Sequence, residues 1–303
     1  MCRETTNPPR RSPRLLLTSV ESFSQDGKSG PPQPMEMFTT GLCVFFMLIF
    51  IEYNLKQLLE YFQHLHPLLE NATNRGILAR HVGVDAFSCF VVAILGWKAS
   101  YINQDMIDAA LGRTKSLTVA FENRVFKYYP EAVRISLFFF AYQIKNTYDT
   151  IVWNDGPEFI AHHILTLFTA WGALVPGSCH YYAMFYFGVS EISTGVLCLL
   201  ANFDDIHGVP GLAAAFPLGK MVLGGLFAVL FVICRVLMWS TVSYYYCRDA
   251  WNALKSNDPR LEGRRTWLRY TFVSLSLLSV LQIIWLGEII RIGHEELKLA
   301  GFL

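Results

Sequence analysis

The sequence predicts an all-α fold, a polytopic membrane helix bundle with about seven transmembrane helices. Of its 303 residues, 53% are hydrophobic and only 16% are charged, whereas soluble domains carry roughly 25% charged residues. The mean hydropathy is +0.33. Seven apolar stretches follow one another after residue 36, and most are near the ~20 residues that a helix needs to cross the hydrocarbon core. No stretch has the alternating pattern of a strand.

Composition excludes several other classes of protein. The net charge is only +1, so the chain lacks the basic excess that nucleic-acid binding needs, and we expect no nucleic-acid partner. Seven cysteines without a Cys-x-x-Cys pair indicate neither a disulfide framework nor a structural zinc site. We therefore expect neither a metal ion nor a bound cofactor.

Residues 1–35 predict a disordered cytosolic tail. The segment holds six of the thirteen prolines, and its one apolar run, at 15–17, is too short for a signal-peptide core. Its arginines and serines would also suit an organelle transit peptide, but Glu4, Glu21 and Asp26 argue against that alternative.

The seven predicted spans follow in order along the chain. The first is short and forms, with its loop, a segment at 36–77. The short link at 176–179 predicts a tight antiparallel hairpin between the fourth and fifth spans. The spans are expected at residues 37–52, 84–102, 132–152, 159–176, 180–202, 218–245 and 269–292.

The distribution of Lys and Arg predicts the orientation. These residues gather in the tail, in the loop after the second span and in the loop after the sixth. Seven crossings place these three segments on one side, which the positive-inside rule makes cytosolic. The motif Asn71-Ala72-Thr73 then faces the lumen, where Asn71 could carry a glycan, although so short a motif also arises by chance.

Ionisable residues inside the spans carry most of the functional information, because hydrocarbon penalises them unless they have partners or water. In the third span, Tyr142, Asn146 and Asp149 share one helical face, together with Trp153. Lys145 precedes Asp149 by one turn, so we expect these two side chains to form an ion pair that holds the bundle together.

The fourth span contains two adjacent histidines, His162 and His163. No His-x-x-x-His or His-x-x-His-His pattern accompanies them, which excludes sites of the di-iron desaturase and elongase type. A neutral imidazole in an apolar site can act as a general base or nucleophile. Alternatively, each ring can simply form a hydrogen bond to a neighbouring helix. Both interpretations stay open at this point.

A buried cation and a polar stripe mark the fifth and sixth spans. Arg235 lies too far from either end of its span to snorkel without strain, so it needs an acidic partner. Glu191 and Asp149 are the two candidates. The polar stripe in the fifth span recurs every three or four residues, at Glu191, Thr194, Cys198 and Asn202.

Other polar and aromatic residues lie near predicted span ends. We expect Glu288 and Arg291 to pair locally, since they are three residues apart near the membrane edge. Aromatic residues at span ends are typical of membrane-interface belts. We expect such a belt at Trp97, Tyr101, Tyr181, Tyr182, Tyr244, Tyr245 and Tyr246.

This ordered set of motifs resembles the TLC-domain family, which includes ceramide synthases and a group of lipid-homeostasis proteins that are not synthases. The resemblance covers residues 78–293. The motifs that carry it are Ala79-Arg80-His81-Val82, Tyr148-Asp149, Phe159-Ile160-Ala161-His162-His163-Ile164, Ser190-Glu191-Ile192-Ser193-Thr194 and the late span with Arg235.

The resemblance implies a six-helix TLC core with a lipid-facing or lipid-enclosing cavity, preceded by one extra helix and followed by a C-terminal tail at 294–303. Ceramide synthases use paired histidines to join an acyl group from acyl-CoA to a sphingoid base, and here these would be His162 and His163. The synthase motif continues, about a helix later, into His-Asp and a further Asp. Here that region has Glu191 as its only acid, which favours the non-synthase branch.

Two hypotheses about function follow. In the first, the protein binds lipid and acts in membrane lipid homeostasis, and Asp149, His162, His163, Glu191 and Arg235 form one buried polar network. In the second, it is a ceramide-synthase-like N-acyltransferase with acyl-CoA as co-substrate, in which a histidine is nucleophile or base and Asp149 or Glu191 orients it. A transporter has less support, because no inverted repeat or ladder of charges is visible.

Under either hypothesis, membrane lipids are the expected partners. The resemblance implies the endoplasmic reticulum as the membrane that holds the protein, with the plasma membrane as the alternative. The sequence does not indicate an oligomeric state.

Overall fold

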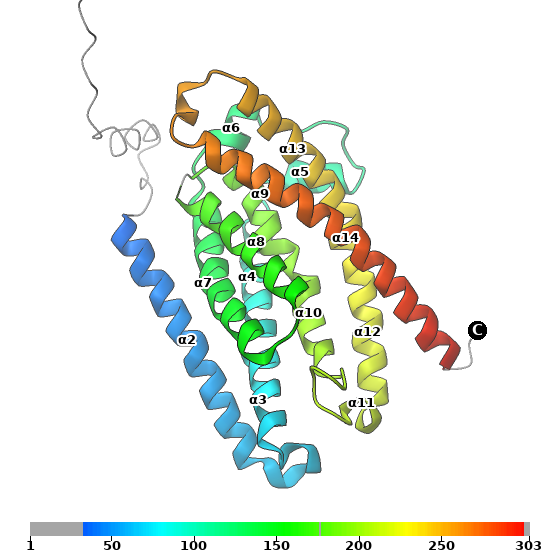
Figure 1. The fold of residues 1–303 in the computed structure, drawn as a ribbon. Coiled ribbons are helices and arrows are strands. Elements are labelled where there is room, and N and C mark those ends of the chain that lie inside the picture. Colours follow the sequence, from blue (N-terminus) through cyan, green and yellow to red (C-terminus); the bar gives the residue numbers. More distant parts are fainter. Residues whose placement is uncertain (1–32, 176, 300–303) are drawn as a thin grey trace, which may run out of the picture.

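A computed structural model describes residues 33–175 and 177–299 (Figure 1). Within these ranges the chain forms helices and no strands. The predicted tail at 1–35 lies almost wholly outside the described residues. The all-helical fold class is confirmed.

Seven long helical segments form the bundle, and three of them contain a π-helical turn. The α-helices are α2 (Pro34–Tyr61), α3 (Ala72–Arg80), α4 (Phe87–Lys98), α5 (Gln104–Ala110), α6 (Phe121–Phe126), α7 (Pro130–Trp153), α8 (Pro157–Leu174), α9 (His180–Met184), α10 (Glu191–Ala201), α11 (Leu212–Ala215), α12 (Pro217–Phe231), α13 (Trp239–Lys255) and α14 (Arg265–Leu299). The π-helical turns η4 (His81–Ala86), η5 (Phe185–Val189) and η6 (Val232–Met238) join α3 to α4, α9 to α10 and α12 to α13. Short 3₁₀ turns occur at η2 (Gln63–Leu65), η3 (Pro67–Leu69) and η7 (Pro259–Leu261).

Each of the seven predicted apolar stretches forms one of these long segments. Five are long and apolar enough to cross a membrane, namely Pro34–Tyr61, Ala72–Lys98, His180–Ala201, Pro217–Lys255 and Arg265–Glu296. The other two, α7 and α8, are not among these five; α7 contains Lys145 and Asp149, and α8 contains the two histidines. Figure 1 shows α7 and α8 running alongside α2, α4 and α10, inside the same bundle.

Proline marks the start of four of these helices. Pro34, Pro130, Pro157 and Pro217 occupy the first turn of α2, α7, α8 and α12. The first turn suits proline because its fixed φ is helical and the N–H that it lacks would have had no partner within the helix. These starts therefore lie within a few residues of the predicted ones.

The second span begins earlier than predicted, at Ala72 and not at 84. Asn71 caps this helix, since its side-chain oxygen accepts a 2.8 Å hydrogen bond from the N–H of Thr73. Arg80 and Asp85 made this stretch look polar, but both side chains are buried. Their charges concealed the first part of the helix from a hydropathy reading.

The last helix also runs further than predicted. A C-terminal tail was expected from residue 294, yet α14 continues to Leu299, and residues 300–303 lie outside the described residues. Arg291 forms the expected ion pair with Glu288, at 2.8 Å, and a second one with Glu295, at 2.9 Å. Such pairs at i, i+3 and i, i+4 stabilise a helix where no packing supports it.

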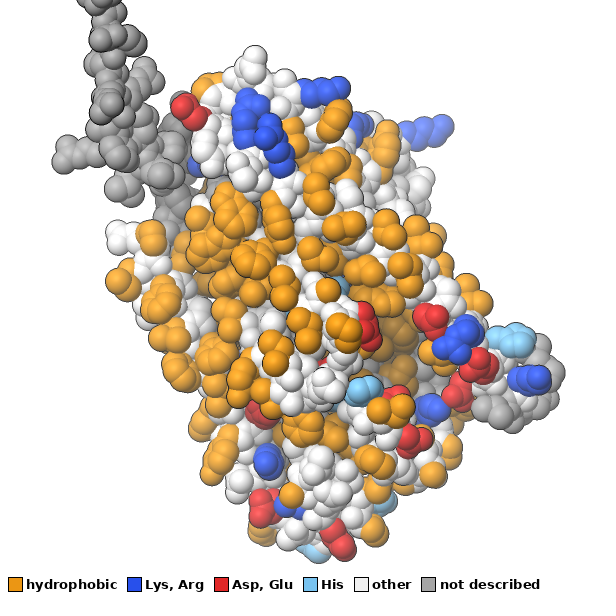
Figure 2. Space-filling model, in the orientation of Figure 1, with side chains coloured by type: hydrophobic (Ala, Val, Ile, Leu, Met, Phe, Trp, Pro, Cys, Tyr) orange, Lys and Arg blue, Asp and Glu red, His pale blue; other side chains and the backbone are white. Residues whose placement is uncertain are grey.

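The two ends of the bundle differ in charge. One end holds α5, α6 and the connection between α13 and α14, and α2 also starts there (Figure 1). We call this the basic end (residues 99–129 and 248–265). Figure 2 shows Lys and Arg side chains gathered there, next to a broad apolar surface over the helices. The positive-inside rule predicts that the basic end is cytosolic, and the orientation stays a prediction.

Small residues allow two segments to pack backbone against backbone. A Cβ atom added to Gly96 of α4 would lie 2.6 Å from the backbone nitrogen of Val189, and one added to Gly188 would lie 2.8 Å from the Cα of Gly96. Membrane helices use small residues at such close approaches. The contact fixes α4 against η5, directly before Glu191.

The predicted aromatic belt is only partly correct. Trp97, Tyr101 and Tyr244 are between 63% and 70% exposed, as interface residues should be. Tyr181 and Tyr182 are instead fully buried in the core, and so is Tyr246, whose ring contacts that of Tyr182 with 5.3 Å between their centroids. The position of these tyrosines near predicted span ends does not reveal whether their side chains face the membrane interface or the interior of the bundle.

The fourth and fifth spans, α8 and α9–α10, are adjacent in sequence but do not pack mainly against each other as the predicted hairpin would require. The helix α8 is joined to α9 by a short link, but it packs mainly against α7 and α14. This arrangement places the face of α8 that carries the histidines beside α14.

Candidate functional site

Each π-helical turn adjoins or contains a buried charged residue. Arg80 directly precedes η4, which contains Asp85, and Glu191 follows η5 after one residue. Arg235 lies within η6. A π-helical turn brings residues five apart onto one face, and such turns are frequent at functional sites. The three turns therefore mark where charge is placed inside the bundle.

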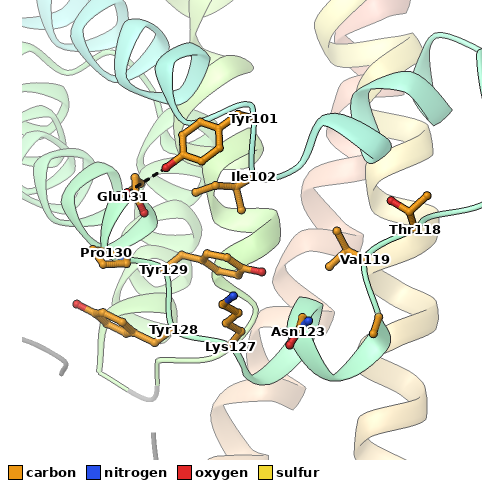
Figure 3. A pocket seen from close by; sticks show the side chains of 11 residues that line it. Tyr101, Ile102, Thr118, Val119, Asn123, Lys127, Tyr128, Tyr129, Pro130 and Glu131 are labelled. Carbon is orange, nitrogen blue, oxygen red and sulfur yellow. Dashed lines mark hydrogen bonds between the residues drawn. The ribbon is translucent and has the colours of Figure 1, made fainter. Parts of the chain in front are cut away.

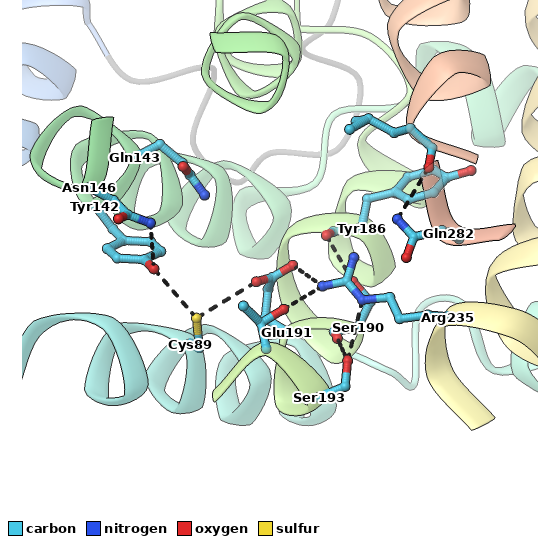
Figure 4. A network of polar contacts seen from close by, with 12 residues as sticks. Cys89, Tyr142, Gln143, Asn146, Tyr186, Ser190, Glu191, Ser193, Arg235 and Gln282 are labelled. Atoms are coloured by element: carbon cyan, nitrogen blue, oxygen red, sulfur yellow. Dashed lines mark hydrogen bonds and ion pairs between the residues drawn. The ribbon is translucent and has the colours of Figure 1, made fainter. Parts of the chain in front are cut away.

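The first buried cluster is centred on Arg235 and Glu191 (Figure 4). The Nη2 atom of Arg235 lies 2.7 Å from Oε1 of Glu191 and 2.6 Å from the hydroxyl of Thr194. Its Nε donates to the hydroxyl of Ser193 at 3.3 Å, and its guanidinium lies over the ring of Trp239, 5.1 Å from the centroid. The prediction that Arg235 pairs with an acidic residue is confirmed, and the partner is Glu191.

Cys89 extends this cluster towards α7. Its sulfur lies 3.7 Å from Oε2 of Glu191 and 3.8 Å from the hydroxyl of Tyr142. The same hydroxyl accepts a 2.9 Å hydrogen bond from the amide of Asn146. The cluster thus joins α4, α7, α10 and η6. Tyr142 and Asn146 of the predicted polar face of α7 serve to connect that helix to it.

Asp149 belongs to a second cluster. The Nζ atom of Lys145 lies 2.5 Å from Asp149 and 2.7 Å from Glu52 of α2. The predicted ion pair of Lys145 and Asp149 is confirmed. The second ion pair of Lys145, with Glu52, was not predicted. Among the described residues, no hydrogen bond or ion pair joins this cluster to Arg235 or Glu191. The expected single network is therefore divided.

A third cluster was missed by sequence reasoning. Arg80 forms an ion pair with Asp155, to which Nη1 donates at 3.2 Å, and its Nε lies 3.7 Å from Asp85. The cluster ties α3 to the link between α7 and α8. The i, i+5 spacing of Arg80 and Asp85 indicates a pair only if the helix widens into a π-helical turn, which the sequence does not reveal.

The two histidines lie on the side of α8 that faces α7 and α14. Nδ1 of His163 lies 3.1 Å from the side-chain oxygen of Gln143. The ring of His162 contacts the ring of Trp285 of α14 edge-on, with 5.1 Å between centroids, and that of His163 at 5.3 Å. Both side chains are half-buried. In the described part of the chain, Nδ1 of His162 is buried and has no hydrogen-bond partner.

The chemistry open to the histidines follows from these contacts. Asp149 contacts Lys145 and Glu191 contacts Arg235, and within the described ranges no carboxylate forms a hydrogen bond or ion pair with either imidazole. A residue pair working as nucleophile and base normally has such an orienting group. The rings are therefore placed to donate or accept hydrogen bonds. Residues 33–175 and 177–299 contain no group of three His, Cys, Asp or Glu side chains that could hold a metal ion.

The remaining predicted residues lie elsewhere. Asn202 donates to backbone carbonyls of its own helix. Of the stripe on α10, Glu191 and Thr194 contact Arg235, and Cys198 interacts with Cys89. Asn71 is exposed beside the connection between α2 and α3, at the end of the bundle opposite the basic end. That position leaves its side chain accessible, and the glycan itself stays a prediction.

Comparison with known proteins identifies the family. The TLC domain family matches residues 80–291, which is well over half of the chain and includes all three clusters apart from Glu52. No curated protein matches the chain. The matched region and the apolar helices together show that the chain is an integral, multi-pass membrane protein and belongs to the TLC domain family.

Proposed function

We propose that this protein binds a membrane lipid within its helix bundle and acts in membrane lipid homeostasis. The single observation that carries the proposal is the state of His162, which is half-buried between helices with a ring nitrogen that has no partner in the described part of the chain. A buried polar atom without a hydrogen bond costs free energy. A lipid hydroxyl, amide or ester group beside α8 and α14 would supply the missing bond.

The neighbouring residues support a site for an amphiphile. Trp285 packs edge-on with the His162 ring and gives it an apolar neighbour, while Gln143 contacts the adjacent His163. Gln282, one turn before Trp285 on α14, is buried, and its side-chain oxygen also has no partner among the described residues. A polar group of a lipid would therefore find an unsatisfied ring nitrogen on α8 and an unsatisfied amide oxygen on α14, and its chains would lie along the apolar helices.

The ion-pair clusters have a different role in this proposal. Arg80, Lys145 and Arg235 each already have an acidic partner, so these residues are not free to bind a ligand. Buried pairs with satisfied hydrogen bonds fix the arrangement of the helices that carry them. The clusters thus hold α4, α7 and α10 in place around the face with the histidines.

The N-acyltransferase alternative has weaker support from the contacts. It requires a carboxylate that orients a histidine, and both candidate acids are bound to cations. Catalytic hydrogen bonds can tighten only when substrate binds, so the alternative is tested together with the proposal. Acyl-CoA would then be the co-substrate.

The test is a comparison of the lipids that remain with the purified protein in nanodiscs. We expect the wild-type protein to retain one lipid class above its share of the membrane. His162→Leu removes the ring nitrogens, and losing one hydrogen bond of about 1 kcal/mol lowers retention about fivefold. His207→Leu is the matched control, because His207 is exposed. Equal retention by wild type and His162→Leu would contradict lipid binding at this place.

The same preparations test acyl transfer. Incubation with a long-chain acyl-CoA and a sphingoid base is followed by mass spectrometry of the lipids and of the peptide that contains His162 and His163. We expect no N-acyl product. A product that disappears when both histidines are replaced by alanine would overturn the proposal in favour of the acyltransferase.

We also propose the endoplasmic reticulum as the compartment, on the basis of the family. Microscopy of a fluorescent fusion with markers of the endoplasmic reticulum and plasma membrane tests this. Surface staining in place of the reticular pattern would argue for the plasma membrane.

A further inference from the structure

A groove lies at the basic end, away from the histidines. It is lined by residues that follow α4, residues that precede α7 and the first turn of α7, including Tyr101, Tyr129 and Glu131, and it has a volume of about 600 Å³ (Figure 3). Since α4 ends at Lys98 and α7 begins at Pro130, the groove lies at the level where the membrane helices end. Helix ends of this kind meet the headgroup layer of a bilayer.

One wall of the groove is held in a fixed position by the half-buried Asp105 and by the buried Arg124 and Asp249. Asp105 accepts 2.8 Å hydrogen bonds from the N–H groups of Thr118 and Val119, and its other oxygen accepts from Tyr181 in the core. Arg124 donates to the carbonyl of Val119 and binds Asp249 through two atoms, at 2.6 and 2.9 Å. The segment 118–124 is therefore anchored to α9 and α13.

The opposite wall is anchored in the same way. The N–H of Tyr129 donates to Nδ1 of His180 at 3.2 Å, and the other ring nitrogen of His180 lies 2.9 Å from the carbonyl of Ala173. Tyr129 is buried, with its ring turned towards the groove in Figure 3. Both walls are thus built on the core of the protein, so the groove is preorganised.

Two opposite charges line this groove, and each contacts a tyrosine. The Nζ atom of Lys127 lies 5.5 Å from the centroid of the Tyr129 ring. The carboxylate of Glu131 accepts a 3.3 Å hydrogen bond from Tyr101, whose pKa is raised by the nearby negative charge. Among the described residues, neither Lys127 nor Glu131 has an ion-pair partner. Elsewhere at this end, Arg260 pairs with Glu122 and Arg113 with Asp108.

We propose that this groove binds the phosphocholine headgroup of a phospholipid in the adjacent leaflet. Lys127 meets the phosphate, while Glu131 and the tyrosine rings hold the quaternary ammonium group. Tyrosine faces attract such cations by about 0.5–1 kcal/mol at exposed sites. The inference goes beyond the proposed function, because the groove is a second site at another depth of the membrane.

The charges favour this occupant over an anionic headgroup. A phosphate group alone would complement Lys127, but it would face the uncompensated carboxylate of Glu131. A zwitterionic headgroup places one charge against each residue, and it needs no further cation. The three aromatic side chains Tyr101, Tyr128 and Tyr129 would have little to contribute to a simple anion site.

The experiment measures lipid selection by the full-length protein in nanodiscs made from equal amounts of phosphatidylcholine and phosphatidylglycerol. Lipids that stay bound after transfer to detergent are quantified. We expect phosphatidylcholine to be enriched in the wild type. Tyr101→Leu lowers that enrichment by about two- to fivefold, the factor equivalent to 0.5–1 kcal/mol. Glu131→Gln lowers it by about 1.4- to fivefold, since exposed ion pairs contribute about 0.2–1 kcal/mol.

Matched controls make the result specific. Glu262→Gln removes the same charge as Glu131→Gln from an exposed position at the same end, outside the groove, and should leave the enrichment unchanged. Thermal unfolding of every variant verifies folding, and His162→Leu should not affect this selection.

Three outcomes would overturn the proposal. These are retention of the two lipids in equal amounts by the wild type, enrichment of phosphatidylglycerol, and enrichment of phosphatidylcholine that the groove variants leave unchanged. Each of these outcomes is read from the groove variants or from the ratio of the two lipids. None of them depends on the result obtained with His162→Leu.

Discussion

Replacing Glu191 by glutamine tests the buried ion pair of the bundle directly. The substitution nearly preserves the shape of the side chain, but it removes the negative charge 2.7 Å from Arg235. Arg235 keeps the hydroxyls of Thr194 and Ser193 and the ring of Trp239, none of which carries a charge. A guanidinium without a counter-ion would then remain where its side chain is only 9% exposed.

The expected loss of stability is large. Breaking a buried pair by removing one partner costs about 3–5 kcal/mol, because it leaves an uncompensated charge. The polar contacts that Arg235 keeps place this variant at the lower end, about 3 kcal/mol. At about 2–4 °C per kcal/mol, Tm falls by roughly 6–12 °C. Replacing both partners, Glu191→Leu with Arg235→Met, should restore much of that stability, since no buried charge is left.

Tryptophan fluorescence during thermal unfolding in nanodiscs provides the measurement. Glu288→Gln is the matched control, because it removes the same charge from a pair whose side chains are more than half exposed, and its Tm should equal that of the wild type. The reasoning is refuted if Glu191→Gln unfolds at the same temperature as Glu288→Gln. It also fails if the double variant is less stable than Glu191→Gln alone.

Three further predictions concern other parts of the chain. Gly96→Ala should destabilise the protein by about 1–3 kcal/mol, because the added Cβ would clash with the backbone of η5. Gly225→Ala should not destabilise it, because a Cβ there meets nothing within 4 Å. Denaturation of both variants tests this prediction. Burial alone would raise the pKa of Asp105. Hydrogen bonds from Tyr181 and from the backbone amides of Thr118 and Val119 outweigh burial and lower this pKa below its ordinary 3.8. Its stabilising effect is therefore present above pH 3.8 and lost as the pH falls through the lower native pKa, and Asp105→Asn should flatten the plot of Tm against pH in that range. Asn71→Gln should remove any glycan-dependent mobility shift in gels, and an unshifted wild-type band after expression in eukaryotic cells would contradict lumenal glycosylation.

Much of the bundle could be predicted because its signals are local. Runs of apolar residues give the starts of α2, α7, α8 and α12 to within a few residues. The pair of Lys145 and Asp149 follows from i, i+4 spacing alone. Arg235 required an acid, and burial left few candidates.

What escaped prediction depends on which helices are neighbours. Glu52 reaches Lys145 only because α2 packs against α7, and His162 meets Trp285 only because α8 lies beside α14. Neither contact has a counterpart in sequence spacing. The groove at the basic end forms only when two walls from separate parts of the chain are anchored to the core. In the sequence alone, its residues are therefore indistinguishable from ordinary loop residues.

The π-helical turns also change how these helices can be read as periodic patterns. Each turn adds roughly one residue to an α-helix, which rotates everything after it by about 100° relative to an uninterrupted helix. A helical wheel drawn through 217–255 is therefore in phase up to Phe231 and out of phase from Trp239 onwards. Deleting one residue within Val232–Met238 would bring the two halves back into register and turn Arg235 or the buried ring of Trp239 away from the interior. Loss of a residue there should consequently be tolerated less well than most substitutions at the same positions.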